Sequence, residues 1–152
     1  MELDDIDSRL LAVLQRDANL TSQELGQILG LSASQAARRR QRLEQAGYVQ
    51  SYVARLDPGQ LGLEVQAFVQ VQMATHDPAR VKGFTRIIDT LPEVVAAWTL
   101  TGEADYLLRV FCRDLASLNR LVHEIILPLP AVARVQSQIV MNQLKPDSPL
   151  PV

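Results

Sequence analysis

The sequence predicts an α+β protein with two domains: a helix-turn-helix domain over residues 1–60 and a ferredoxin-like β-α-β-β-α-β domain over residues 61–152. The first half carries two helix-capping motifs on either side of Gly30, an arrangement typical of two helices joined by a very short turn. The second half alternates between segments with the two-residue period of strands and segments with the helical period. These two observations define the fold class.

Three helices are expected in the first domain. Ile6, Leu10 and Leu14 form one apolar stripe on a helix over residues 4–16. Each of the next two helices begins with a capping box, in which the cap residue and the third helical residue bond each other's backbone. The boxes are Thr21 with Glu24 and Ser32 with Gln35, and the helices end at Gly30 and Gly47. A generic three-helix bundle remains an alternative, but the tight turn favours a helix-turn-helix.

A strand and a turn are expected between the domains. YVQSYVARLD, residues 48–57, alternates like a strand, and DPGQLG then breaks it and marks the boundary. The strands expected after it are VQAFVQVQMA, EVVAAWTLT, DYLLRVFC and AVARVQSQIVMNQL, and the helices are DPARVKGFTRIIDTL and DLASLNRLVHEIIL. This order places both helices on one face of a four-stranded sheet.

The opposite sheet face is also expected to need cover. Val69 and Val71 point to one side of the first strand and Phe68 to the other, while Leu107 and Phe111 share a face of the third strand. A sheet with two apolar faces favours packing against the sheet of a second copy. The expected assembly is therefore a dimeric α/β sandwich.

Composition narrows the class of protein. The formal net charge is −2 and the pI is near 5.6, so any binding of nucleic acid must be local. The single Cys112 excludes a disulfide within the chain and a multi-cysteine metal site, and no metal or cofactor is expected. MELDDIDSRL lacks the features of a signal peptide, and no apolar run approaches the roughly 18 residues of a membrane span. We therefore expect a cytoplasmic protein with no membrane partner.

Positive charge is concentrated in AARRRQRL, residues 36–43. On a helix, Gln35, Arg38, Arg39 and Arg42 share one face. A solvated helix face usually mixes charges of both signs, whereas this one is positive throughout its middle. Guanidinium groups suit phosphates and guanine, and the second helix of a helix-turn-helix enters the major groove. The predicted contacts with double-stranded DNA are Ser32, Ser34, Gln35, Arg38, Arg39 and Arg42.

The loop LTGEADY joins two predicted strands and is a candidate ligand site. Gly102 allows close backbone approach, neighbouring N–H groups suit a carboxylate, and Asp105 suits an ammonium group. A simple hairpin turn accounts for the same residues, and from spacing alone it is the better explanation.

Two stretches resemble a known family. LDDIDSRLLAVLQRDANLTSQELGQILGLSASQAARRRQRLEQAGYVQSYVARLDPGQLG resembles the N-terminal half of the Lrp/AsnC (feast/famine) transcription regulators, and LPEVVAAWTLTGEADYLLRVFCRDLASLNRLV looks like their effector-binding domain. The resemblance implies a winged helix-turn-helix domain, a hinge strand and a dimerising βαββαβ domain. It also implies assembly into higher oligomers, often octameric rings of four dimers, and a response to amino acids.

The resemblance assigns the effector loop as well. Family members bind effector through a Thr-Gly-x-x-Asp loop between dimers, matched here by Thr101, Gly102 and Asp105. Trp98 is expected either to select the effector side chain or to fill the dimer core. Family members usually carry Val or Ile where this chain has Arg40, so we expect the Arg40 head group to extend past the core.

An enzyme resembling siroheme decarboxylases is the alternative function, because these share the fold. The candidate reactive side chains are few. His76 and His123 are expected near a helix cap and on a surface, and Cys112 is expected to be inert packing. No nucleophile or acid–base pair shows catalytic spacing. The sequence therefore favours a regulator and not an enzyme.

Overall fold

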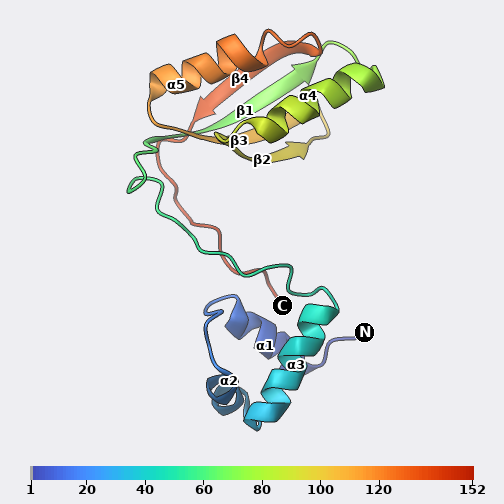
Figure 1. Cartoon of the computed structure of the whole chain (residues 1–152), viewed down its shortest axis with the longest axis vertical. Coiled ribbons are helices and arrows are strands. Elements are labelled where there is room, and N and C mark those ends of the chain that lie inside the picture. The colour runs from blue at the N-terminus through green and yellow to red at the C-terminus, as the bar shows by residue number, and fades with distance from the viewer. Residues whose placement is uncertain (1) are drawn as a thin grey trace. The chain divides into compact units, whose positions relative to one another are not determined.

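The computed structural model describes residues 2–152, and the chain divides into two compact units. Unit 1 comprises the residues up to Arg55 together with Leu144–Val152, and unit 2 is Leu56–Gln143 (Figure 1). The last residues belong to unit 1 because the side-chain amide of Gln15 bonds both the N–H and the carbonyl of Leu150, at 2.6 and 3.0 Å. None of the helices in the described part of the chain is long and apolar enough to cross a membrane.

Unit 1 is built from three helices, α1 (Asp5–Leu14), α2 (Ser22–Leu29) and α3 (Ala33–Gln45). The predicted capping boxes at Thr21 and Ser32 are both present, which confirms where α2 and α3 begin. A third box, missed in the sequence, starts α1 at Asp4, whose side chain accepts from the Asp7 N–H at 2.7 Å. Side-chain acceptors thus satisfy backbone N–H groups at the start of every helix in this unit.

The turn between α2 and α3 is compact, and two glycines permit it. Gly30 has a φ of +70° at the end of α2, a left-handed conformation that glycine adopts without strain. A Cβ atom on Gly26 would lie 2.6 Å from the Leu31 carbonyl oxygen, so only glycine fits there. The core of unit 1, to which all three helices contribute, consists of Leu10, Leu11, Leu14, Leu25, Leu29, Ala36 and Leu43.

The predicted strand over residues 48–57 is absent, and that prediction is wrong for the single chain. Residues 49–57, here called the linker segment, have no regular secondary structure and form no ladder with any described strand. Val53 and Leu56 in this segment are exposed. The alternation of apolar residues is real, but a strand also requires a neighbour to accept its backbone hydrogen bonds, and the single chain supplies none.

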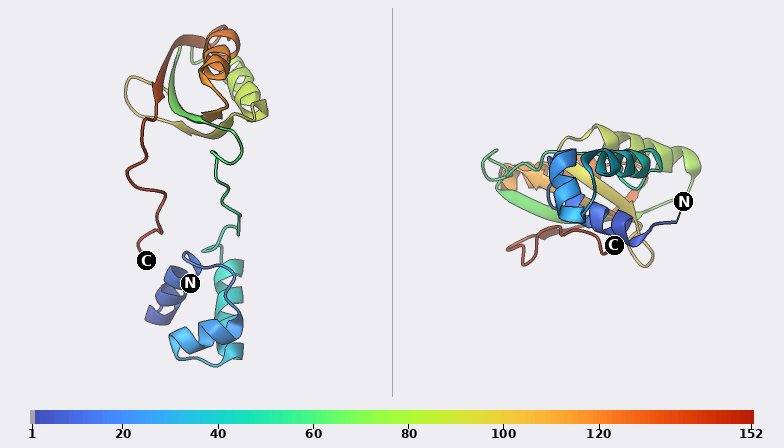
Figure 2. Two further views of the ribbon diagram at one scale, coloured as in Figure 1. Left: turned by 90° about the vertical axis from the view of Figure 1, so that its left-hand side faces the viewer. Right: turned by 90° about the horizontal axis from the view of Figure 1, so that it is seen from below.

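Unit 2 is a four-stranded antiparallel sheet with its helices on one face, as predicted. The strands are β1 (Val65–Met73), β2 (Val94–Thr99), β3 (Tyr106–Cys112) and β4 (Val132–Ile139), in the spatial order β2-β3-β1-β4. Figure 2 shows α4 (Pro78–Thr90) and α5 (Leu115–Arg120) on the same side of the sheet. A π-helical segment, Leu121–Ile126, extends α5. The β-α-β-β-α-β order is confirmed.

The two faces of this sheet differ in chemistry. The face under the helices is mostly apolar, and its fully buried side chains include Val69, Val71, Leu108 and Val110. Strand register places two groups on the open face. One is apolar except for Arg109, which lies over the Phe111 ring, and comprises Phe68, Leu107, Phe111 and Trp98. The other is polar and comprises Gln66, Gln70, Gln72, Gln136 and Gln138. The expectation of two apolar faces is therefore wrong for the β1–β4 half, because cross-strand pairing gathers glutamines there.

Candidate DNA-binding and effector sites

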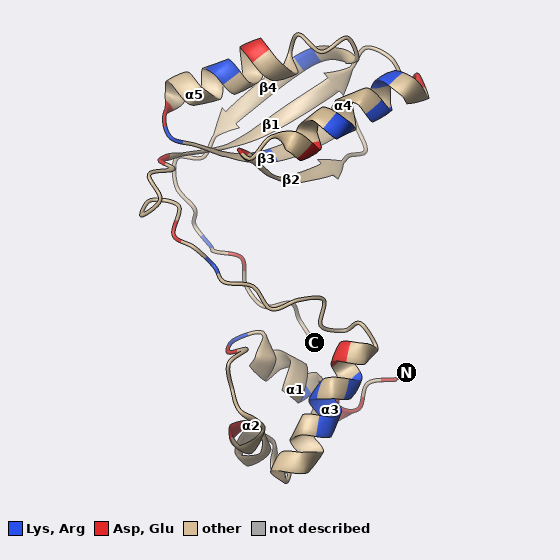
Figure 3. Cartoon of the chain, viewed as in Figure 1, with Lys and Arg blue, Asp and Glu red and all other residues tan. Residues whose placement is uncertain are grey.

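The arginines of α3 form a positive band around the middle of the helix (Figure 3). Ala36 and Leu43 lie on the side of α3 that faces the core of unit 1, and both side chains are fully buried. Ser34, Arg38 and Gln41 are exposed and follow one another at helical spacing, so they form one outward ridge. Gln41 was not among the predicted contacts, although its position three residues after Arg38 was a signal for it.

Arg39 and Arg42 bind carboxylates at the start of α1, from its N-cap Asp4 and from Asp7. Arg39 Nη1 donates to Asp4 Oδ2 and to Asp7 Oδ1, both at 2.7 Å, and Arg42 Nη2 donates to Asp7 Oδ2 at 2.5 Å. The Asp7 side chain is only 1% exposed, so both of its oxygens are enclosed by the two guanidinium groups. These contacts attach α3 to α1 and give two of the predicted DNA-binding arginines a role in the fold.

The electrostatics follow from this geometry. The Arg39 guanidinium is the largest of the causes that hold the pKa of Asp4 below its usual value, and Asp4 in turn raises the pKa of Arg39.

Asp7 was not identified as a site residue from the sequence, although the sequence contained a signal for it. It precedes Leu10, Leu11 and Leu14 at the three-, four- and seven-residue spacing of a single helix face. An acid within an apolar stripe requires a buried cationic partner.

Side chains of the first turn of α3 form its capping box. The Ser32 N–H donates to Gln35 Oε1 at 2.9 Å, and the Gln35 N–H donates to Ser32 Oγ at 3.2 Å. Ser32 Oγ also lies 3.1 Å from Ser34 Oγ. Three of the predicted contacts therefore lie together at the exposed N-terminal end of the helix, where N–H groups and the helix dipole favour an anion.

The loop between β2 and β3 is anchored by its last residue. Asp105 Oδ2 accepts from the Met73 N–H at 2.7 Å, and the Asp105 N–H donates to the Val71 carbonyl at 3.0 Å. Thr101 and Gly102 are exposed, and Gly102 has a φ of +109° that strongly favours glycine. The carboxylate predicted to meet an ammonium group thus uses one of its oxygens to fix the loop on the end of β1.

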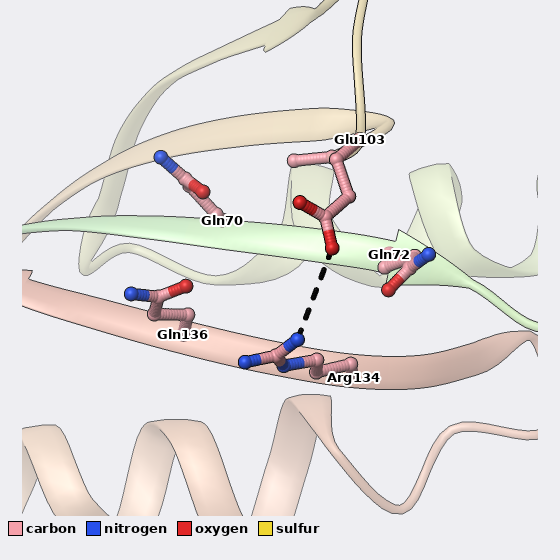
Figure 4. Close-up of a pocket in the computed structure, with 6 residues that line it drawn as sticks. Gln70, Gln72, Glu103, Arg134 and Gln136 are labelled. Carbon is pink, nitrogen blue, oxygen red and sulfur yellow. Dashed lines mark ion pairs between the residues drawn. The ribbon is translucent and has the colours of Figure 1, made fainter.

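A polar hollow of about 110 Å³ lies on the open sheet face beside this loop. It is lined by Gln70, Gln72, Glu103, Ala104, Arg134 and Gln136. Figure 4 shows Glu103 and Arg134 reaching toward each other across it, and their charged atoms are 3.9 Å apart. Glu103 and Arg134 were not identified in the sequence, because the register of β4 beside β1 could not be foreseen.

The remaining predicted residues lie elsewhere in unit 2. Trp98 pairs with Leu107 on the open sheet face, is 46% exposed and does not line the hollow. Cys112 is buried, and this burial raises the pKa of its thiol. Both histidines are exposed, His76 in the loop between β1 and α4 and His123 in the π-helical segment. Within residues 2–152 no group of three or more His, Cys, Asp or Glu side chains could hold a metal ion.

These features define a two-domain protein with a helix-turn-helix unit and a unit that carries a polar ligand hollow. The family model for the Lrp/AsnC ligand-binding domain matches residues 66–150, and a model for winged helix-turn-helix DNA-binding domains matches residues 3–50. The first of these covers more than half of the chain. The chain therefore belongs to the Lrp/AsnC family of transcriptional regulators, and the resemblance noted in the sequence is confirmed.

Individual relatives are similar along their whole length. The DNA-binding transcriptional activator DecR of Escherichia coli (strain K12) is 34% identical over 150 residues, covering 99% of each chain. The leucine-responsive regulatory protein of Rhizobium meliloti is 34% identical over 145 residues, covering 95% of this chain and 93% of its own. A Neisseria meningitidis transcriptional regulator in complex with L-methionine has 37% identity and a TM-score of 0.93, covering 99% of this chain and 97% of its own.

Proposed function

We propose that this protein is a sequence-specific DNA-binding transcriptional regulator whose activity responds to an amino acid. The observation that carries the proposal is the outward ridge of α3, where Arg38 is exposed and lies outside the ion pairs that hold Arg39 and Arg42. A helix-turn-helix places the exposed side of its second helix in the major groove of DNA. The family membership supports the same conclusion.

The DNA contacts divide into three roles. Arg38 and Gln41 reach base edges, since Arg pairs with guanine and Gln with adenine. Ser32, Ser34 and Gln35 approach the phosphate backbone from the start of α3. Arg42, which is 47% exposed, adds a phosphate contact, whereas Arg39 acts by holding α3 on α1.

The test of DNA binding is selection of fragments from a random duplex pool by the full chain. We expect a shared sequence to be enriched, with an affinity that falls steeply with salt as counterions are released. Competition with unrelated DNA measures the specificity ratio. Enrichment of no sequence, or an affinity independent of salt, would contradict the proposal.

The effector is proposed to bind at the loop between β2 and β3. Backbone N–H groups at Thr101 and Gly102 suit the carboxylate of an amino acid, and Asp105 suits its ammonium group. The adjoining hollow offers opposite charges at Glu103 and Arg134 together with glutamine side chains. Similar proteins support an amino acid, because one is named as leucine-responsive and another is a complex with L-methionine.

Calorimetric titration of the full chain with each of the twenty amino acids tests this site. Asp105→Asn keeps an oxygen that accepts from the Met73 N–H but removes the charge, so effector binding should be lost while the fold remains. Gly102→Val should also lose binding, since valine is strained at this φ. An Asp105→Asn variant with wild-type affinity would place the effector elsewhere.

Two copies of the chain are proposed to pack through the open sheet face, with further assembly toward an octamer. Trp98 and Leu107 lie together on that face, and Trp98 is half-exposed in the single chain. The pairing of Trp98 with Leu107, and its absence from the lining of the hollow, support a role for Trp98 in the dimer core. Sedimentation of the wild-type chain should show a dimer or a larger species. A Trp98→Lys variant should sediment as a smaller species with unchanged helix content, and no change in size would contradict this interface.

A further inference from the structure

Arg40 forms a set of contacts that the DNA-binding role does not use. Its side chain is 23% exposed at the edge of the unit 1 core. Nη1 donates to the Leu20 carbonyl at 3.1 Å and Nη2 to the Ala18 carbonyl at 3.3 Å. Nε donates to Glu44 Oε1, one turn further along α3, at 3.0 Å. The planar guanidinium is therefore fixed in both position and orientation.

Tyr52, in the linker segment after α3, completes this cluster. Its hydroxyl donates to Glu44 Oε1 at 2.7 Å and accepts from Arg40 Nε at 3.2 Å. The Arg40 guanidinium carbon lies 4.9 Å from the centroid of the Tyr52 ring, which is within the range of a cation–π interaction. Hydrogen bonds from Tyr52 and Arg40 hold the pKa of Glu44 below its ordinary value, so Glu44 is ionised at neutral pH.

The cluster adds to the few contacts that hold the linker segment on unit 1, where Val49 packs against the core. Within the single chain, residues 49–57 form no ladder, so side-chain contacts set their course. Arg55 donates to the Asp147 carbonyl at 2.9 Å, but its side chain is 71% exposed. Arg40 and Glu44 lie on α3 itself, which also carries the outward ridge of Ser34, Arg38 and Gln41. The start of the linker segment is therefore attached to the same helix that is proposed to read DNA.

We propose that Arg40, Glu44 and Tyr52 form a clamp that sets the direction in which the chain leaves α3, and thereby the spacing between the two DNA half-sites that a dimer reads. The inference rests on the proposed DNA binding and dimer. Half-site spacing is a geometric property of how two recognition helices are linked. If the direction of the linker segment is fixed, the two recognition helices can reach only a few half-site spacings. If it is flexible, they can reach many spacings, but the effective concentration of the second helix at its half-site is lower at each of them. Tyr52 is thus a positioning residue that touches no DNA.

The test uses the half-site that wild-type protein selects from random DNA, arranged as pairs with a graded series of spacings. We expect wild-type protein to prefer one spacing by about tenfold or more over its neighbours. Tyr52→Ala should reduce that preference to about twofold, because the linker segment becomes flexible while α3 stays packed in unit 1. Tyr52→Phe keeps the ring over Arg40 and loses both hydroxyl bonds, so its preference should be intermediate. Val53→Ala, at the exposed neighbouring position, is the matched control and should behave as wild type.

Affinity for a single half-site separates positioning from simple stability. It should be the same in wild-type, Tyr52→Ala and Tyr52→Phe proteins. A Tyr52→Ala variant with the wild-type spacing preference would overturn the clamp, and so would an equal loss of affinity for single and paired half-sites. Wild-type protein that binds single half-sites without any spacing preference would overturn the clamp and leave the proposed DNA binding intact. Wild-type protein that selects no half-site would overturn both.

Discussion

The two units of this chain are stabilised in different ways. Unit 1 has a small leucine-rich core surrounded by three capping boxes and by ion pairs from α3 to α1 and within α3. Unit 2 buries a larger cluster drawn from all of its strands except β2 and from its helical segments, and it leaves one sheet face open. In a unit with little apolar surface to bury, charged groups contribute more of the specificity of packing.

The comparison shows that a cluster of like charges can serve two purposes. Four arginines on α3 suggest a single DNA-binding surface, but Arg39 and Arg42 also bind Asp7, and Arg40 binds carbonyl groups and Glu44. Arg38 alone of the four lies outside these contacts and is exposed. The open face of unit 2 differs, because it combines two kinds of side chain, an apolar group and a group of glutamines. The apolar group suits contact with a second copy of the chain, and the glutamines suit a polar ligand.

The largest effect on stability should follow from a substitution that creates a cavity in the core of unit 2. Leu108 is fully buried, and Leu108→Ala should cost about 3–4 kcal/mol of unfolding free energy. Hydrogen exchange followed by mass spectrometry resolves each unit. Faster exchange is expected in peptides from β1 and β3, with little change in peptides from α1 and α3. Equal loss of protection in both units would show that they are not stabilised independently.

A somewhat smaller effect should follow from removing the buried carboxylate of unit 1. Asp7→Ala leaves Arg39 and Arg42 without their shared partner and should cost about 2–3 kcal/mol, less than for a fully enclosed pair because both arginines reach water. The loss should appear in exchange of α1 and α3 peptides and not in those of the sheet. Asp5→Ala removes the same charge from an exposed position on the same helix and is the control. Similar losses in the two variants would contradict a specific role for Asp7.

Acid should weaken unit 1 before unit 2. The pKa values of Asp4, Glu24 and Glu44 are lowered in the fold by hydrogen bonds to Arg39, to the Thr21 N–H and to Tyr52, respectively. Such carboxyls bind protons more weakly when folded, so their stabilisation is complete above their unfolded pKa values and is lost as the pH falls through the folded values.

In unit 2, the pKa of Asp114 is lowered, chiefly by the hydrogen bond that its carboxylate accepts from the Ser117 N–H. Brief pepsin digestion between about pH 4.5 and 3 should therefore cut unit 1 first. Earlier cleavage within the sheet of unit 2 would be the contrary result.

Local signals in the sequence predicted much of the fold. Capping boxes at Thr21 and Ser32 are short-range features, and they located α2 and α3 correctly. The alternation of strand and helix periods likewise predicted the order of unit 2. Both depend on residues within a few positions of each other, which is the range over which a single sequence is informative.

Features that depend on distant partners were predicted less well. The strand expected over residues 48–57 needs a neighbouring strand, which the single chain does not supply. The pairing of Asp7 with Arg39 and the facing of Glu103 with Arg134 join residues far apart in the sequence. The helical spacing that grouped Arg38 with Arg39 and Arg42 did not reveal which of them bind the acids of α1.

The central claim is that α3 contacts DNA bases through Arg38 and is held on α1 by Arg39. One paired measurement tests this claim. DNA affinity and the stability of unit 1 are measured for Arg38→Ala and Arg39→Ala, with Arg86→Ala, an exposed arginine on α4, as the charge control. Arg38→Ala should lose about 1–3 kcal/mol of binding free energy at unchanged stability. Arg39→Ala should destabilise α1 and α3, and it should keep base preference at every position of the site. Arg38→Ala binding DNA as tightly as wild type, or Arg39→Ala losing base preference without any loss of stability, would contradict the account.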